Sequence, residues 1–130
     1  MEIVKPTAVR ELTDHKVNEC NDKLKIEAIG SYGFRYDITG FDTETNPGKD
    51  RDGYASSFGR LPVIFHNGPI GEAGANGVTN ESLLAIIIDR LRSLRGSPYE
   101  RHDSNVALVH LETAMLWLTR QPGQQKGSKQ

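Results

Sequence analysis

The chain lacks most features that would tie it to a covalent, metal-bound or membrane-embedded architecture. It has one cysteine, Cys20, among 130 residues, which excludes an internal disulfide. No apolar run approaches the roughly 20 residues of a membrane span, and no segment follows the signal-peptide pattern. The four histidines, at positions 15, 66, 102 and 110, have no ligand-like spacing with Cys20. We therefore expect a cytoplasmic protein without a structural metal site or a membrane partner.

An excess of charge of either sign is also missing. Sixteen basic and seventeen acidic residues give a formal net charge of -1. A protein that binds duplex nucleic acid relies on a basic face to displace counterions, so we expect no such partner. A small anionic ligand stays compatible, because it needs only a few local cations. With 36% hydrophobic and 25% charged residues, residues 1–120 fit one globular domain, whereas the polar tail at 121–130 is typical of disorder.

The first half of the chain, residues 9–66, carries the patterns of a small sheet. KLKIEAIG and GFRYDITG place apolar residues at every second position, which predicts two half-buried strands. The GSYG connection predicts an antiparallel hairpin, because Gly30 and Gly33 can take the positive φ of such turns. RLPVIFH predicts a further strand, and Pro62 near its start favours an edge position or the beginning of a strand.

Two other segments complete this half. LTDHKVNECND predicts a helix of about two turns, with Thr13 as the N-cap, Asp14 in the first turn, and Val17 and Cys20 on one face. Residues 42–57 are polar and rich in turn-forming residues, which predicts a surface loop that can be mobile. Loops of this length are often functional.

The last third predicts two helices, within residues 80–119. Asn80 can cap the first, and Gly96 and Pro98 end it. Asp103 or Ser104 can cap the second, which continues to the QPGQ segment. So short a connection requires an antiparallel helical hairpin. The apolar stripe of the first helix comprises Leu83, Leu84, Ile87, Ile88, Leu91 and Leu94.

Further apolar residues, Ile86, Val109 and Leu116, lie outside the narrowest stripes. We therefore expect each helix to bury more than one face, against the sheet or against a second subunit. The expected fold class is α+β, with a small N-terminal antiparallel β-sheet, a short helix and a C-terminal antiparallel α-helical hairpin.

The segment FHNGPIGEAGANGVTN, residues 65–80, has a glycine at every third position from Gly68 to Gly77. It matches neither the GxGxxG dinucleotide motif nor the GxxxxGK[ST] phosphate loop, and it is too short for a collagen helix. Backbone N–H groups without neighbouring side chains, followed by a helix N-terminus, can receive an anion. An ordinary glycine-rich loop explains the same residues, and the chemistry alone favours that interpretation over an anion site.

FHNGPIGEAGANGVTNESLLAIIIDRL, followed by NVALVHLETAMLWL, resembles the phage Thoeris anti-defence family one sponge proteins, which share their helical hairpin with anti-CBASS sponges. The resemblance covers residues 61–120 and, more loosely, 18–42. It implies a protein of the host cytoplasm that holds cyclic ADP-ribose isomers made by TIR-domain immune enzymes and does not cleave them. It also implies a homo-oligomer, from dimer to hexamer, that can bind cyclic di- or trinucleotides between subunits.

The resemblance further implies an aromatic platform, with amide and backbone groups beside it and an arginine from the first hairpin helix. It implies no catalytic residue and no cofactor. Arg90 and Arg92 both lie near the end of that helix, where Asp89 can pair with Arg92, and the sequence does not choose between the two. The implied ligand-binding residues are Phe65, His66, Asn67, Gly68, Asn76, Gly77 and Arg90 or Arg92.

Two other functions fit the residues. A small hydrolase of the same cyclic nucleotides would use His66, His102 or His110, although nothing in the sequence sets a nucleophile beside them. A purely structural oligomer would use the helical hairpin for assembly alone. Recovery of intact ligand separates a sponge from a hydrolase, and the absence of any nucleotide affinity indicates the structural oligomer.

Overall fold

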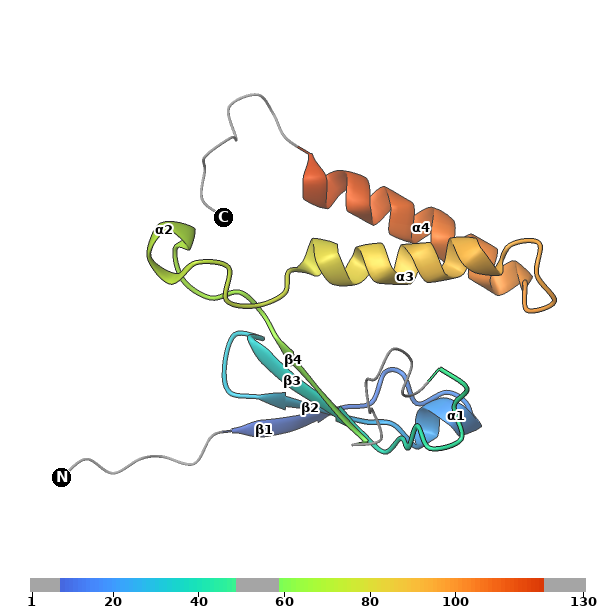
Figure 1. Cartoon of the computed structure of the whole chain (residues 1–130), viewed down its shortest axis with the longest axis horizontal. Coiled ribbons are helices and arrows are strands. Elements are labelled where there is room, and N and C mark those ends of the chain that lie inside the picture. Colours follow the sequence, from blue (N-terminus) through green and yellow to red (C-terminus); the bar gives the residue numbers. More distant parts are fainter. Residues whose placement is uncertain (1–7, 49–58, 121–130) are drawn as a thin grey trace. The chain divides into compact units, whose positions relative to one another are not determined.

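The computed structural model describes residues 8–48 and 59–120, and the chain divides into two compact units, residues 1–65 and 66–130. The first unit contains a sheet and the second a pair of long helices (Figure 1). The predicted α+β class, with an N-terminal antiparallel sheet and a C-terminal helical hairpin, is confirmed.

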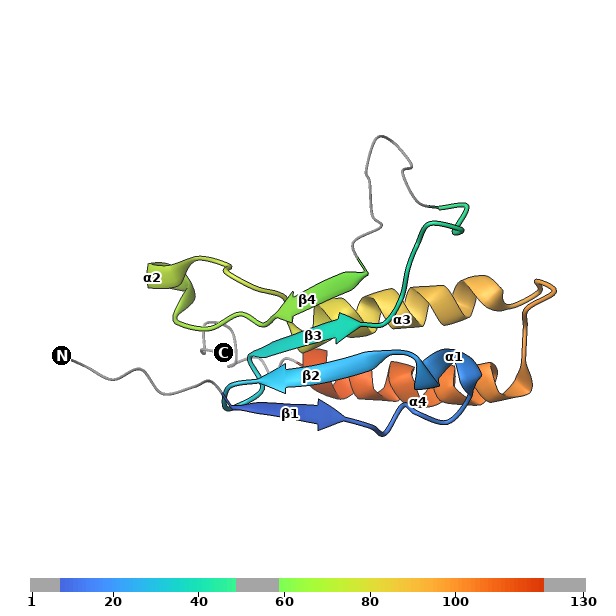
Figure 2. The ribbon, with the colours of Figure 1, turned by 90° about the horizontal axis from the view of Figure 1, so that it is seen from below.

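The sheet of the first unit has four antiparallel strands in the order β1-β2-β3-β4 (Figure 2). The three strands expected from the sequence are β2, β3 and β4, and Pro62 lies on an edge strand as predicted. The strand bounds are β1 Val9–Leu12, β2 Lys25–Ile29, β3 Arg35–Thr39 and β4 Arg60–Ile64.

The register of the strands gives the sheet one apolar face and one charged face. Ile26 pairs with Leu12 on one side and Ile38 on the other, and Ile38 pairs with Leu61, so these residues form an apolar row. Ala28 lies on the same face and is 2% exposed. The neighbouring row, on the opposite face, holds Glu11, Glu27 and Asp37. This alternation confirms the period-two pattern of the two hairpin strands.

The turn between β2 and β3 has the backbone that the glycines predicted. Gly30 and Gly33 have φ values of 83° and 70°, and Tyr32 between them also has a positive φ, 64°. A Cβ at Gly33 would lie 2.7 Å from the Tyr36 hydroxyl oxygen. The positive φ of Gly33 is what favours glycine there, because the Tyr36 hydroxyl lies at the end of a side chain that can shift.

The predictions before β2 were wrong in two respects. Residues Val9–Leu12 form β1, a strand that the sequence pattern did not predict. The helix also begins later than expected, because α1 is Glu19–Asp22. Its N-cap is Asn18, whose Oδ1 accepts the Asn21 N–H at 2.9 Å. The segment from Thr13 to Asn18 contains a turn and a bend instead, and His15 Nε2 donates to the Leu24 carbonyl at 2.6 Å.

The loop expected over residues 42–57 is described only up to Gly48. Asp42 Oδ1 accepts the Glu44 N–H, and Asn46 Oδ1 accepts the Gly48 N–H. These contacts are turns in which a side chain bonds to the backbone two residues on, as the composition predicted. The remainder of the loop, and the tail at 121–130, lie outside the described residues.

The second unit contains the predicted hairpin. Helices α3, Asn80–Leu94, and α4, His102–Thr119, run side by side in opposite directions (Figures 1 and 2). Ile88 is 5% exposed and Leu108 is fully buried. No helix in the described ranges is both long and apolar enough to span a membrane.

The apolar residues outside the stripes are exposed in the chain as described. Ile86, Val109 and Leu116 are 62%, 55% and 70% exposed, respectively. The second buried face that we expected for each helix is therefore not buried within this unit.

The helix starts in the hairpin each differ from the predicted ones. Thr79, not Asn80, caps α3, and α4 begins one residue before Asp103 without any side-chain cap. Glu100 organises the connection instead: its carboxylate accepts the Gly96 N–H and the Asn105 side-chain amide, both at 2.9 Å. The Asn105 amide, followed by the Gly96 N–H, holds the pKa of Glu100 below its ordinary value.

Candidate functional site

The glycine segment at the start of the second unit is a loop closed by two hydrogen bonds between Asn67 and Asn76. The Asn67 N–H donates to Asn76 Oδ1 at 2.8 Å, and Asn76 Nδ2 donates to the Asn67 carbonyl at 2.7 Å. We call this pair of bonds the asparagine clasp. One side-chain amide thereby satisfies both backbone groups of a residue nine positions earlier, as a β-strand partner would.

The clasp continues through His66. The His66 N–H donates to the Val78 carbonyl at 2.9 Å, and the Asn76 N–H donates to His66 Nδ1 at 3.3 Å. Since Nδ1 accepts a hydrogen bond, the neutral ring carries its proton on Nε2. The structure thus brings together three of the implied site residues, His66, Asn67 and Asn76.

The two asparagine side chains have different roles in the clasp. The Asn76 amide is used inside the loop, on the Asn67 backbone. The Asn67 side chain is exposed and makes no hydrogen bond with any residue in the described ranges. Asn67 therefore presents a free amide to solvent, whereas Asn76 orders the backbone that carries it.

Within the loop lies a short helix that the sequence interpretation missed. This helix, α2, is Ile70–Ala73, and Pro69 precedes it with φ -66°. The Pro69 carbonyl accepts the Ala73 N–H at 2.8 Å. Gly68 has φ 112°, a conformation that side chains disfavour, and Gly77 follows the clasp in a half-buried position. Pro69 is the N-cap of this helical turn, with an extended backbone and no side-chain cap.

The N-terminus of α3 offers less to an anion than its position suggests. Thr79 and Ser82 form a capping box in which the Ser82 N–H donates to Thr79 Oγ1 at 3.0 Å and the Thr79 N–H donates to Ser82 Oγ at 2.9 Å. Glu81 adds a negative charge in the first turn. The cap and this carboxylate already use part of the positive potential at the helix end.

The two candidate arginines have different environments. Arg92 Nε donates to Glu112 Oε2 of α4 at 3.0 Å, so it pairs across the hairpin and not with Asp89 as the spacing allowed. Arg90 is exposed and forms no ion pair or hydrogen bond with residues 8–48 or 59–120. At 1.5 Å per residue, Arg90 lies about 15 Å along α3 from Asn80. Within one chain, neither arginine is therefore brought up to the clasp.

Phe65 ends the first unit and is packed by Tyr36 of β3. The two ring centroids are 6.0 Å apart and the rings are nearly perpendicular, at 84°. Phe65 is half-exposed, and its N–H donates to the Phe34 carbonyl at 2.8 Å. The edge-to-face contact and the backbone bond both restrict the orientation of the Phe65 ring.

The charged face of the sheet holds a buried carboxylate that sequence reasoning missed. Asp37 is 6% exposed, and it accepts hydrogen bonds from Arg35 and Arg60. The Arg60 guanidinium, and then Arg35, hold the pKa of Asp37 below its ordinary value, against the opposing effect of burial. The only sequence signal was an acidic residue at a polar position of β3, flanked two residues earlier by an arginine.

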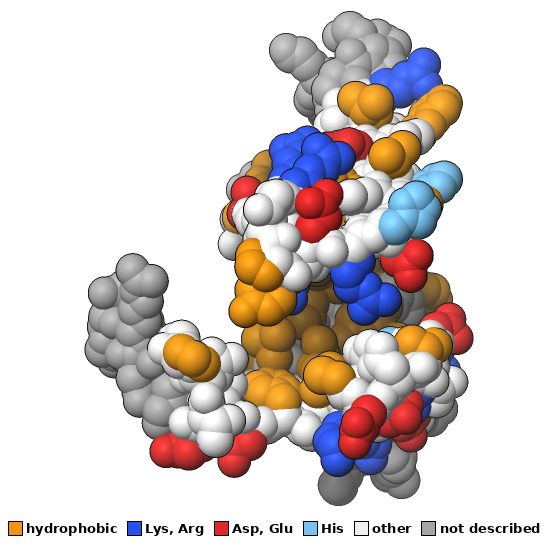
Figure 3. All heavy atoms as spheres, turned by 90° about the vertical axis from the view of Figure 1, so that its right-hand side faces the viewer, with side chains coloured by type: hydrophobic (Ala, Val, Ile, Leu, Met, Phe, Trp, Pro, Cys, Tyr) orange, Lys and Arg blue, Asp and Glu red, His pale blue; other side chains and the backbone are white. Residues whose placement is uncertain are grey.

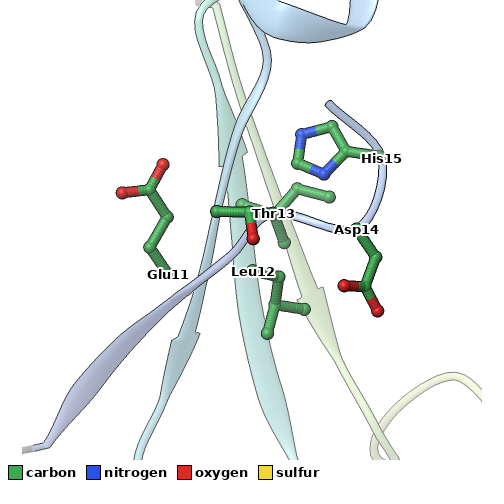
Figure 4. Close-up of a pocket in the computed structure, with 6 residues that line it drawn as sticks. Glu11, Leu12, Thr13, Asp14 and His15 are labelled. Atoms are coloured by element: carbon green, nitrogen blue, oxygen red, sulfur yellow. The ribbon is translucent and has the colours of Figure 1, made fainter. Parts of the chain in front are cut away.

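An open pocket of about 310 Å³ lies in the first unit beside the end of β1 (Figure 4). Its lining carries two carboxylates, Glu11 and Asp14, and the Nε2 proton of His15 is already donated to a backbone carbonyl. A pyrophosphate would meet like charges here, so the pocket does not suit an anionic nucleotide. The lining residues are Glu11, Leu12, Thr13, Asp14, His15 and Ile26.

The surface charge is mixed where it can be seen. Figure 3 shows acidic and basic side chains next to each other on the face that it views, in place of a surface of one sign. No group of three or more histidine, cysteine, aspartate or glutamate side chains suited to a metal ion occurs among the residues that the structure describes.

Comparison with known proteins gives one informative similarity. No protein-family model matches the chain. The chain is similar to "Thoeris anti-defense 1" of Bacillus phage SBSphiJ7, with 36% identity over 69 residues. These residues make up 52% of this chain and 49% of the relative, so the chain spans about half the length of that protein.

Proposed function

We propose that this chain is a sponge for cyclic nucleotide immune signals. Its 36% identity to a curated relative supports membership of the viral Thoeris anti-defence family. It binds a cyclic ADP-ribose isomer made by a TIR-domain enzyme, and also cyclic di- or trinucleotides. It holds the signal in the host cytoplasm and releases it unchanged. The downstream effector therefore does not receive its activating nucleotide.

The similarity to an anti-defence protein carries this proposal, and the geometry of the glycine loop supports it. The clasp fixes the Asn67 backbone through the Asn76 amide before any ligand arrives. A preformed site spends less of its binding free energy on ordering loops and side chains. A protein that works by retention benefits from this, because affinity differences among related complexes lie mostly in the rate of release.

The adenine of the ligand stacks on Phe65 in this proposal. Its ring is already oriented by Tyr36 and is half-exposed. Stacking of a base on an aromatic side chain contributes about 1–3 kcal/mol in single-strand binders, and a similar contribution is expected here. The exposed Asn67 amide and the backbone at Gly68 and Gly77 supply hydrogen bonds to the riboses.

Arg90, rather than Arg92, supplies the charge for the pyrophosphate. Arg92 is engaged with Glu112, whereas Arg90 has no such partner in the described parts of the chain. A guanidinium that is not already paired gives up no ion pair when it binds a phosphate oxygen. Its distance from the clasp along α3 favours an oligomer in which a second copy brings Arg90 to the loop.

Sequestration without cleavage agrees with the state of His66. Its Nδ1 lone pair accepts the Asn76 N–H, and the opposite nitrogen carries the ring proton. A general base must offer a free lone pair to the proton that it removes. The loop therefore holds this imidazole as a structural acceptor.

The test is a calorimetric titration of the purified protein with a cyclic ADP-ribose isomer prepared from a TIR-domain enzyme. The complex is then heated and the released nucleotide is identified by mass. Tight binding and recovery of intact nucleotide are expected. A cleaved product would overturn the sponge and support a hydrolase. Absence of affinity for this isomer and for cyclic di- and trinucleotides, checked by equilibrium dialysis as well as by heat, would leave only a structural oligomer.

Variants locate the site within the same experiment. Phe65→Ala and Arg90→Ala should each weaken binding by about tenfold or more, the equivalent of roughly 1.4 kcal/mol. Arg92→Ala should weaken it less, through loss of the ion pair with Glu112 alone. Arg101→Ala is the matched control, because Arg101 is 72% exposed and pairs only with Asp103 among the described residues. An Arg90→Ala protein that binds like the control would remove Arg90 from the site.

A further inference from the structure

We propose that α2 is a flap, hinged at Gly68 and Gly74, that closes over the bound nucleotide, and that Ile70 is the residue with which it covers the ligand. This inference rests on the proposed function and adds to it a moving element and a contact residue that the sequence pattern did not indicate.

The base of the loop is held and its tip is not. Four hydrogen bonds converge at the base, two in the clasp and two through His66. Every residue from Asn67 to Asn76 is exposed. In both ribbon views α2 stands clear of α3 within the second unit (Figures 1 and 2). A tip without packing on a fixed base can move as one body while its ends stay in place.

The two hinges are defined by their backbone angles. Gly68 has φ 112° and Gly74 has φ 68°, one on each side of α2. Glycine at such positions can change φ over a wide range without a steric penalty. Gly71 lies between them inside α2, and a Cβ there would meet nothing within 4 Å. The two glycines with positive φ thus lie on either side of the helical turn, and Gly71, whose φ is not positive, lies within it.

Ile70 is the apolar group that the flap carries. Ile70 is the first residue of α2. Its side chain is 67% exposed, so it is not part of the core of the hairpin. The face of a purine is an apolar surface that an aliphatic side chain can cover. Closure would shield Ile70 and the nucleotide from water together and would slow release, since an open flap must precede dissociation.

Amide hydrogen exchange tests the motion in the free protein and in the complex. Without ligand, the amides of Glu72, Ala73 and Gly74 bond only within the exposed turn of α2, so they should exchange much faster than those of His66 and Asn67, which are bonded across the base of the loop. Saturation with the cyclic ADP-ribose isomer from a TIR-domain enzyme should slow exchange in the flap. Binding by calorimetry without added protection of these amides would overturn the flap and leave the proposed function standing.

Release rates of the same isomer test the hinge and the contact residue. Ile70→Ser should speed dissociation about tenfold, the scale expected when a large aliphatic contact is lost. Val17→Ser, at a side chain 76% exposed on the first unit, is its matched control. Gly74→Ala should also speed release, because alanine does not hold φ 68°, whereas Gly71→Ala should not.

The outcomes are distinguishable. Equal release rates for Ile70→Ser and Val17→Ser, or for Gly74→Ala and Gly71→Ala, would overturn the flap while binding itself persists. Failure of the wild-type protein to bind this isomer or any cyclic di- or trinucleotide would overturn the proposed function and, with it, closure over a ligand.

Discussion

Asp37 carries its negative charge inside the sheet, between the guanidinium groups of Arg35 and Arg60. Removing that charge leaves two half-exposed arginines, 38% and 53% exposed, without their shared counter-ion and leaves their hydrogen bonds weaker. We expect Asp37→Asn to lower the free energy of unfolding at pH 7, measured by urea denaturation. Asp89→Asn, on the exposed side of α3, is the control and should unfold like the wild type.

The same substitution has a defined pH dependence. The folded pKa of Asp37 lies below its ordinary value of 3.8. Its stabilisation is therefore complete above about pH 4 and is lost as the pH falls through the lowered pKa. Between pH 5 and pH 2 the unfolding free energy of Asp37→Asn should fall less steeply than that of the wild type. Parallel curves for the two proteins would show that the carboxylate does not contribute.

Leu108 is the fully buried side chain of the helical hairpin. Truncating a buried leucine removes its transfer free energy and leaves a cavity, which costs about 2–5 kcal/mol. We expect Leu108→Ala to lose that much stability in chemical denaturation. Val17→Ala, at a side chain 76% exposed, should change stability by less than about 0.5 kcal/mol. Equal effects of the two changes would mean that α3 and α4 do not pack in solution as described.

At the scale of the element, the start of α3 depends on a reciprocal cap. Thr79 and Ser82 each accept the other's backbone N–H. Thr79→Ala should cost about 0.5–2 kcal/mol of stability, as loss of an N-cap does. Ser82→Ala should cost part of the same energy, and the double variant less than the sum of the two. Additive losses in this double-mutant cycle would contradict a coupled capping box.

The strands that were predictable are those whose side chains alternate. β2 and β3 place isoleucines and an alanine or tyrosine on one face, so the sequence alone indicated them. β1 was missed because Val9 lies on the charged face and Arg10 on the apolar one, which removes any period-two signal. Pairing with β2 makes this segment a strand despite its sequence, and tertiary context often overrides local preference in this way.

The elements of the candidate site were predictable to a lesser extent. The glycine spacing located the loop, but the clasp joins residues nine positions apart and α2 is only four residues long. Periodicity cannot register either feature. The choice between Arg90 and Arg92 depends on Glu112, which lies twenty positions beyond Arg92 on another helix. Such a pairing is decided by how the hairpin folds and not by local spacing.

At the scale of the whole molecule, α4 remains apolar on sides that its own hairpin does not cover. Leu116 and Trp117 are 70% and 66% exposed, and Val109 is 55% exposed. Soluble monomers rarely leave large contiguous apolar patches in water, and such patches usually mark interaction sites. We propose that these residues meet a second copy of the chain, which also agrees with the distance between Arg90 and the clasp within one copy.

Light scattering after size exclusion tests this assembly. The wild type should have a mass that is a multiple of 14.4 kDa at micromolar concentration. Leu116→Glu should shift the mass toward a single chain with unchanged helix content, because a carboxylate is costly to bury in an apolar contact. Val17→Glu on the first unit is the control and should keep the wild-type mass. If assembly completes the nucleotide site, Leu116→Glu should also lose ligand affinity. A wild type that elutes as a single chain would remove both the interface and the shared site.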